Sequence, residues 1–138
     1  MLFFCLLFLI YSMSNSENKT TEFIPFKTKY TLEDRHKEFL RIRTAFPSKI
    51  PVIVEPSNKK QPGIDRHKYL ISSDLLIGQF IYGLRSRIKL APEEALFFFV
   101  NNKIPHMSET VGEIYSREKD KDGFIYMLYS KENAFGSF

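Results

Sequence analysis

The pattern of apolar and polar positions changes near Phe26, and from there it predicts a folded domain. Thr31 is a plausible helix cap, with Asp34 three positions later; apolar residues then recur at helical spacing until Pro47 ends the pattern. Runs rich in β-branched residues follow, alternating with amphipathic stretches. The predicted elements, in chain order, are a helix over residues 31–46, strands over 50–54 and 68–71, a helix from residue 73 or 74 to about 88, a strand over 95–100, a short helix over about 108–115 and a last strand over 124–130.

The second long helix carries an apolar stripe at i, i+4 spacing, interrupted by two glycines. Each of Gly78 and Gly83 costs about 1 kcal/mol relative to alanine in a helix, so we expect close packing or a shallow groove there. The run over residues 95–100 is continuously apolar, which predicts a strand buried on both faces. The stripe consists of Leu76, Phe80, Leu84 and Ile88.

Composition excludes several classes of protein. The chain has 138 residues, 43% of them apolar and 14 of them Phe, which is enough for one well-packed domain. Its net charge of +4 comes from basic residues scattered among acidic ones, so the sequence predicts no nucleic-acid partner. Cys5 is the only cysteine, and no His residues stand at metal-ligand spacing. We therefore expect neither an enzyme nor a metal or other cofactor.

The N-terminal segment, residues 1–24, leaves two interpretations open. Residues 1–11 are apolar but too few to span a bilayer, which needs about 20. They have the length of a signal-peptide core, although no basic residue precedes them and no clear cleavage site follows. Alternatively, translation begins at Met13, and residues 12–24 form a polar, disordered leader. The first interpretation implies a secreted or membrane-tethered protein and the second a cytoplasmic one.

The order of the elements predicts an α+β fold, a ubiquitin-like β-grasp in which a sheet wraps around one long helix. The domain is expected over residues 25–133, followed by a flexible tail over 134–138. In that tail, Gly136 follows Phe135 and precedes only Ser137 and Phe138. Glycine has no Cβ, so its carbonyl is open to attack and its backbone fits a narrow channel. This arrangement suits a protein whose own C-terminus is the reactive group.

These features together resemble a known family, the autophagy ubiquitin-like modifiers, or GABARAP-type proteins. The resemblance covers nearly all of residues 26–136 and implies a β-grasp with two extra N-terminal helices. The matching stretches are Phe26-Lys27 with Tyr30, Ile50-Pro51-Val52-Ile53, Ile64-Asp65 with Lys68-Tyr69-Leu70, Asp74-Leu75 with Gly78-Gln79-Phe80, Arg85 with Arg87-Ile88, Phe99-Val100-Asn101, Asp120-Lys121-Asp122-Gly123-Phe124, and Tyr129-Ser130 with Glu132-Asn133 and Phe135-Gly136.

The resemblance implies a modifier that other enzymes process. A cysteine protease would cut after Gly136, and activating and conjugating enzymes would join the exposed carboxyl to phosphatidylethanolamine, with Phe135 helping them to grip the tail. The chain would be cytoplasmic, and would lie on autophagosome or vacuole membranes once it carries the lipid. Because a two-chain lipid supplies about 0.8 kcal/mol per buried methylene, such an anchor is stable.

The resemblance also implies a groove for peptides with an aromatic-x-x-aliphatic motif, added as a strand to the edge at residues 68–71. Ser72 stands where relatives usually have proline, and Gly83 where they have a larger apolar residue, so we expect altered selectivity at the aliphatic pocket. The aromatic pocket maps to Glu38, Ile42, Pro51, Ile53, Lys68, Leu70 and Phe124. The aliphatic pocket maps to Tyr69, Ile71, Leu75, Phe80 and Leu84, and cations for acidic flanking residues are Lys49, Arg66 and Lys68.

Two alternatives to this function remain. One is a ubiquitin-like docking module that is never conjugated, with an inert tail. The other is the secreted or membrane-tethered protein described above. For the apolar pocket residues, plain core packing is the alternative, and it is the better interpretation for Phe80 and Leu84.

Overall fold

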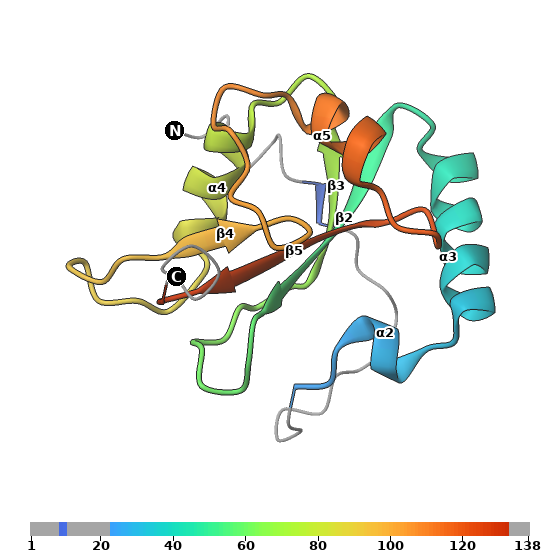
Figure 1. The fold of residues 1–138 in the computed structure, drawn as a ribbon. Coiled ribbons are helices and arrows are strands. Elements are labelled where there is room, and N and C mark those ends of the chain that lie inside the picture. Colours follow the sequence, from blue (N-terminus) through green and yellow to red (C-terminus); the bar gives the residue numbers. More distant parts are fainter. Residues whose placement is uncertain (1–8, 11–22, 133–138) are drawn as a thin grey trace.

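The computed structural model describes residues 9–10 and 23–132, which form an α+β arrangement around one mixed sheet (Figure 1). The sheet has five strands in the order β1-β3-β2-β5-β4, of which β2 and β5 are parallel and the other pairs antiparallel. The strands are β1 (Leu9–Ile10), β2 (Lys49–Pro56), β3 (Lys68–Ser72), β4 (Phe97–Phe99) and β5 (Ile125–Ser130). The helices are α2 (Phe26–Lys29), α3 (Leu32–Ala45), α4 (Ile77–Arg85) and α5 (Val111–Glu118).

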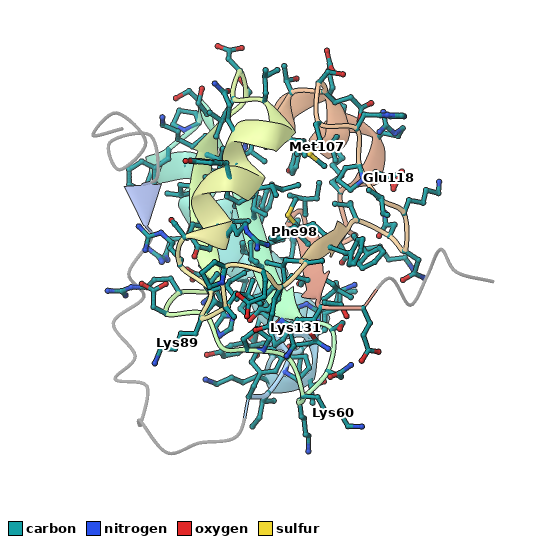
Figure 2. All side chains as sticks on the ribbon, turned by 90° about the vertical axis from the view of Figure 1, so that its left-hand side faces the viewer. Lys60, Lys89, Phe98, Met107, Glu118 and Lys131 are labelled. Carbon is teal, nitrogen blue, oxygen red and sulfur yellow. The ribbon has the colours of Figure 1, made fainter. Side chains whose placement is uncertain are left out.

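Helices lie on both faces of the sheet, and each face has its own core (Figure 1). Successive side chains of a strand point to opposite faces, so Val52 and Val54 of β2 join one core while Ile53 joins the other. The larger core lies against α4 and α5, and the smaller one against α2 and α3. Phe98 of the edge strand β4 points into the larger core (Figure 2).

Helix α3 begins and ends where the sequence predicts. The Thr31 hydroxyl accepts a hydrogen bond from the Asp34 backbone N–H at 3.1 Å, which satisfies one of the free donors of the first turn. At the other end the chain leaves the helix at Phe46, just before Pro47. The prediction of this helix from its cap and its terminating proline is confirmed.

Helix α4 begins at Ile77, later than the predicted start at residue 73 or 74, and ends at Arg85 rather than near Ile88. Residues 73–74 instead lie in a turn, in which Leu75 N–H donates to Ser72 O at 3.1 Å. The first helical N–H groups find partners outside the helix: Ile77 N–H donates to Glu109 O and Gly78 N–H to Met107 O. Met107 lies beside this helix (Figure 2), and the chain that follows β4 thus fixes the point at which α4 begins.

The packing around Gly78 explains why α4 contains a glycine despite its poor helix propensity. A Cβ on Gly78 would lie 3.2 Å from Met107 O and 3.3 Å from Met107 Cβ, closer than most such contacts. The close packing that the sequence predicted for this glycine is therefore present.

The predicted strand over residues 95–100 is shorter than expected. Only Phe97–Phe99 pair, on the outer side of β5, and β4 is an edge strand rather than a central one. Phe98, Phe99 and Val100 are buried, whereas Leu96 and Phe97 are only partly covered. This apolar run thus lies at the edge of the sheet. Directly after it the chain turns at Asn101 and Asn102, which both have positive φ.

The helix predicted over about 108–115 is α5, displaced toward the C-terminus to Val111–Glu118. Thr110 caps it, and Glu113 reaches back to the Thr110 N–H, which forms a complete capping box. Among the described residues, no helix is both long enough and apolar enough to cross a membrane.

A buried ion pair joins α3 to the turn before β5. Arg35 Nε lies 2.8 Å from Asp122 Oδ2, and the Asp122 side chain has no exposed surface. Asp122 Oδ1 also accepts the Phe124 N–H at 2.9 Å, while Arg35 donates to Tyr30 O at 2.9 Å. This network links the two N-terminal helices to the turn that leads into the last strand.

Candidate functional site

The candidate site is built around strand β3, whose side chains serve both faces of the sheet. Tyr69 and Ile71 point into the core that contains α4, and Leu70 points into the core that contains α3. A segment added to the edge of β3 would have its own side chains directed alternately to these same two faces. The structure thus places the residues assigned to the two predicted pockets on opposite sides of one strand; their role in binding a peptide stays a prediction.

The aromatic pocket residues gather on the α3 side. Ile42 comes from α3, Ile53 from β2, Leu70 from β3 and Phe124 from the position just before β5, and all are at most 2% exposed. Pro51 lies opposite Leu70 in the register of β2 and β3.

A proline is tolerated at position 51 because of how the ladder alternates. Val54 N–H donates to His67 O at 2.7 Å. In an antiparallel pair every second residue bonds to the partner strand, so Val52 and Ile50 also bond to β3, whereas Pro51 lies at a position that does not. The missing N–H of Pro51 would face β5, whose pairing with β2 starts only at Val52.

Glu38 and Lys68 place opposite charges near this aromatic pocket. Burial raises the pKa of Glu38 above its ordinary value, and the positive charge of Lys68 opposes that rise. Glu38 also forms a two-point ion pair with Arg41 on the same helix, with Oε2 3.1 Å from Arg41 Nε. The Lys68 Nζ lies 4.7 Å from the centre of the Phe26 ring, a cation–π distance.

Sequence reasoning missed two aromatic residues at this site, Phe26 and Tyr30. The Phe26 ring packs edge-on against Phe124 with centroids 5.4 Å apart, and Tyr30 lies 5.1 Å from Phe26. Both rings lie under Lys68 Nζ, at 4.7 and 5.9 Å. For Tyr30, the available signal was its place directly before the predicted helix, because an apolar residue there often anchors the helix to a core.

Helix α2 is tied to the sheet through a buried carboxylate. The Phe26 N–H donates to Glu55 Oε2 at 2.7 Å, and Glu55 is 6% exposed. Burial raises the pKa of Glu55, while this hydrogen bond and the positive charge of Lys27 lower it. Glu55 therefore holds Phe26 beside the aromatic pocket residues.

The aliphatic pocket residues all lie in the larger core. Tyr69, Ile71, Phe80 and Leu84 are at most 1% exposed, and Leu75 is 6% exposed. The rings of Tyr69 and Phe80 pack edge-on with centroids 5.8 Å apart. Phe80 and Leu84 are therefore core residues in this structure, as the simpler interpretation expected, and Leu75 keeps the most surface of the five.

Both departures from the usual family pattern lie near this group. Ser72 ends β3, and its hydroxyl accepts a weak hydrogen bond from Asp74 N–H at 3.4 Å. Gly83 is buried in α4, one residue before Leu84. Altered peptide selectivity at these two positions stays a prediction.

The three predicted cations do not form one patch. Lys49 pairs with Ser72 at one end of β3, whereas Arg66 and Lys68 lie at the other end. Ile53, the partner of Lys68, lies four steps along the extended strand from Lys49, a distance of about 13 Å. Acidic residues on the two flanks of a peptide would therefore meet different cations.

Other predicted or possible sites lie elsewhere. Phe135 and Gly136 fall outside the described residues. A surface cavity of about 360 Å³ opens near the β4 edge of the sheet and is lined in part by Val100, Ile114 and Arg117. Within residues 9–10 and 23–132, no group of three or more His, Cys, Asp or Glu side chains is placed to hold a metal ion.

Comparison with known proteins gives consistent matches. Residues 34–136 match the family model described as autophagy protein Atg8, ubiquitin like. The chain is 52% identical over 114 residues to autophagy-related protein 8d of Arabidopsis thaliana, covering 82% of this chain and 95% of the relative. It is 50% identical over 113 residues to autophagy-related protein 8A of Oryza sativa, covering 81% and 95%.

Two solved structures share the fold. One is Plasmodium falciparum Atg8 in complex with a Plasmodium falciparum Atg3 peptide, with a TM-score of 0.72, 32% identity and coverage of 80% of this chain and 98% of that one. The other is Trypanosoma brucei ATG8, with a TM-score of 0.70, 38% identity and coverage of 78% and 94%. The α+β ubiquitin-like fold predicted from the order of elements is confirmed.

Proposed function

The chain belongs to the Atg8 family of autophagy ubiquitin-like proteins, and from this premise we propose that it is processed after Gly136 and conjugated to phosphatidylethanolamine. On the membrane it recruits cargo receptors and autophagy factors that carry an aromatic-x-x-aliphatic motif. Proteins of this family are modifiers and not enzymes, so the processing protease and the activating and conjugating enzymes are its partners.

One observation carries the peptide-binding part of the proposal: β3 lies between two apolar clusters that come from opposite faces of the sheet. Main-chain hydrogen bonds to β3 supply affinity for any extended peptide, while the two clusters select alternate side chains. We assign the aromatic side chain of the motif to the cluster of Ile42, Ile53, Leu70 and Phe124, and the aliphatic one to the face of Leu75.

A conjugating enzyme is among the expected ligands. The Plasmodium falciparum relative, with a TM-score of 0.72, was solved with an Atg3 peptide. By similarity, a peptide from the conjugating enzyme of this chain binds at the same kind of site. Such a contact would hold the enzyme close to the C-terminal tail during conjugation.

The tail performs the second part of the function. Once the protease removes Ser137 and Phe138, the activating enzyme uses ATP to adenylate the Gly136 carboxyl and releases pyrophosphate. An enzyme thiol then displaces AMP to form a thioester, and the lipid amine displaces that thiol to form the amide. Two acyl chains bury enough methylenes, at about 0.8 kcal/mol each, to anchor the protein stably. The chain is then cytoplasmic before conjugation and bound to the autophagosome or vacuole membrane afterwards.

The test is a reconstituted or cellular conjugation assay with Gly136→Ala. We expect this variant to fold normally but to give no lipid-linked product, because the added methyl group blocks the narrow channels of the protease and the activating enzyme. Gly63→Ala is the matched control, since a Cβ at Gly63 meets nothing within 4 Å, and it should be conjugated like the unmodified chain. Normal lipidation of Gly136→Ala would overturn the assignment of this residue.

A separate measurement tests the groove. A fluorescent peptide with the aromatic-x-x-aliphatic motif should bind, and a version with both motif residues replaced by alanine should not. If both peptides bind equally or neither binds, the proposed groove is wrong, whatever the result at Gly136.

A further inference from the structure

The edge of β3 is occupied by another part of the chain. Strand β1 (Leu9–Ile10) pairs antiparallel with it, Leu9 opposite Leu70 and Ile10 opposite Tyr69. Figure 1 shows this short strand beside β3, on the side away from β2. The edge that the proposed function assigns to a peptide is therefore covered by β1 at Tyr69 and Leu70.

The backbone geometry shows which groups β1 takes. Since Val54 N–H donates to His67 O, the alternation of an antiparallel pair directs the N–H and C=O groups of Tyr69 and Ile71 toward β2. The groups of Lys68 and Leu70 then point to the outer edge. Leu9 lies directly opposite Leu70, so β1 uses the same main-chain donor and acceptor that an added peptide would need.

The sequence of this segment suits the role. Residues 1–11 carry no charged side chain, and Leu9 and Ile10 continue a run of large apolar residues. Apolar, β-branched and aromatic residues are favoured in strands. Because the segment is part of the same chain, its pairing with β3 is intramolecular and needs little intrinsic affinity to compete with a free peptide.

We propose that Leu9–Ile10 competes intramolecularly with peptides for the edge of β3. A peptide can then bind only when it displaces β1 or when the chain lacks β1. This inference rests on the proposed peptide-binding function. If β1 covers the edge in nine of ten molecules, the apparent Kd of a peptide rises about tenfold, because only the free fraction binds. A chain that starts at Met13 lacks β1 and would bind without this penalty.

The first experiment compares four forms of the protein by fluorescence anisotropy with one labelled aromatic-x-x-aliphatic peptide. They are the full chain, the chain starting at Met13, the full chain with Leu9→Pro and Ile10→Pro, and a control with Asn15→Pro and Ser16→Pro. Two adjacent prolines remove the N–H of every residue in β1, whichever of them faces β3. We expect the Met13 form and the β1 variant to bind about tenfold more tightly than the full chain and the control.

Equal binding by all four forms would overturn the competition while leaving the groove intact. No binding by any form would overturn the proposed peptide-binding function itself. A second measurement uses no peptide: hydrogen exchange of the Leu70 amide should be faster in the Met13 form than in the full chain, because β1 no longer protects it. Equal exchange rates at Leu70 would also overturn the proposal.

Discussion

Replacing Arg35 by methionine tests how the N-terminal helices are held on the sheet. In the structure Arg35 Nε lies 2.8 Å from the fully buried Asp122 carboxylate, and its guanidinium also donates to the backbone oxygens of Lys27 and Tyr30. Arg35→Met leaves the buried Asp122 charge without its paired cation. Removing one partner of such a pair destabilises a protein by about 3–5 kcal/mol.

The remaining partners of Asp122 set the expected value within that range. The Phe124 N–H and the Tyr126 hydroxyl still donate to the carboxylate, so the buried charge keeps two hydrogen bonds. We therefore expect a loss near the lower end, about 3 kcal/mol. Because α3 also carries Glu38 and Ile42, the loss should be accompanied by weaker peptide binding.

Urea unfolding at neutral pH measures this change directly. Lys37→Met on the same helix is the matched control, since Lys37 pairs with Glu33 on the surface with 69% of its side chain exposed, and it should change the free energy of unfolding by less than about 0.5 kcal/mol. Combining Arg35→Met with Asp122→Asn should cost clearly less than the sum of the single changes. A loss below about 1 kcal/mol for Arg35→Met, or strict additivity, would refute the reasoning.

Three further predictions follow from other contacts. Burial raises the pKa of Glu55, so its contribution to stability is present below the ordinary carboxyl range and is lost as pH rises through the raised value. Glu55→Gln keeps an acceptor for Phe26 N–H, and the stability of the natural chain minus that of this variant, measured by chemical denaturation, should fall as the pH rises above the ordinary carboxyl range, whereas a constant difference would contradict this. Gly123 has a φ of +100°, and a Cβ there would clash with the Phe39 ring. Gly123→Ala should therefore lose about 1–3 kcal/mol of stability in thermal unfolding, and an unchanged Tm would rule out the clash. Because Gly83 leaves α4 without a side chain beside the aliphatic pocket residues, binding constants for Leu, Ile and Phe at the aliphatic peptide position should favour Phe, the bulkiest of the three, by up to about 1–3 kcal/mol. An unchanged preference, like that of relatives with a larger residue there, would count against this.

Local signals in the sequence predicted much of the fold. Thr31 and Pro47 bracket α3 because capping and proline effects act within one turn of the chain. The order of strands and helices was enough to predict the β-grasp. The start of α4 was wrong because it depends on Glu109 and Met107, which are distant in sequence and accept its first N–H groups. The 95–100 strand was predicted too long because an apolar run does not reveal that it lies at an edge.

The candidate site was predicted through resemblance rather than through periodicity. The apolar residues assigned to each pocket do gather on opposite faces of β3. Alternation along the strand fixes the faces of Tyr69, Leu70 and Ile71 once residues 68–71 are placed in it, but the residues that come from other elements depend on tertiary packing. Three features escaped prediction because they are long-range: the anchoring of Phe26 by Glu55, the ion pair of Arg35 with Asp122, and the pairing of β1 with β3.

The most direct test of the central claim is the intact mass of the endogenous protein recovered from cell membranes during starvation. The account predicts a species that ends at Gly136 and carries the added mass of phosphatidylethanolamine. If every recovered molecule retains Ser137 and Phe138 and carries no lipid, the protein is not a conjugated modifier, and the account is wrong.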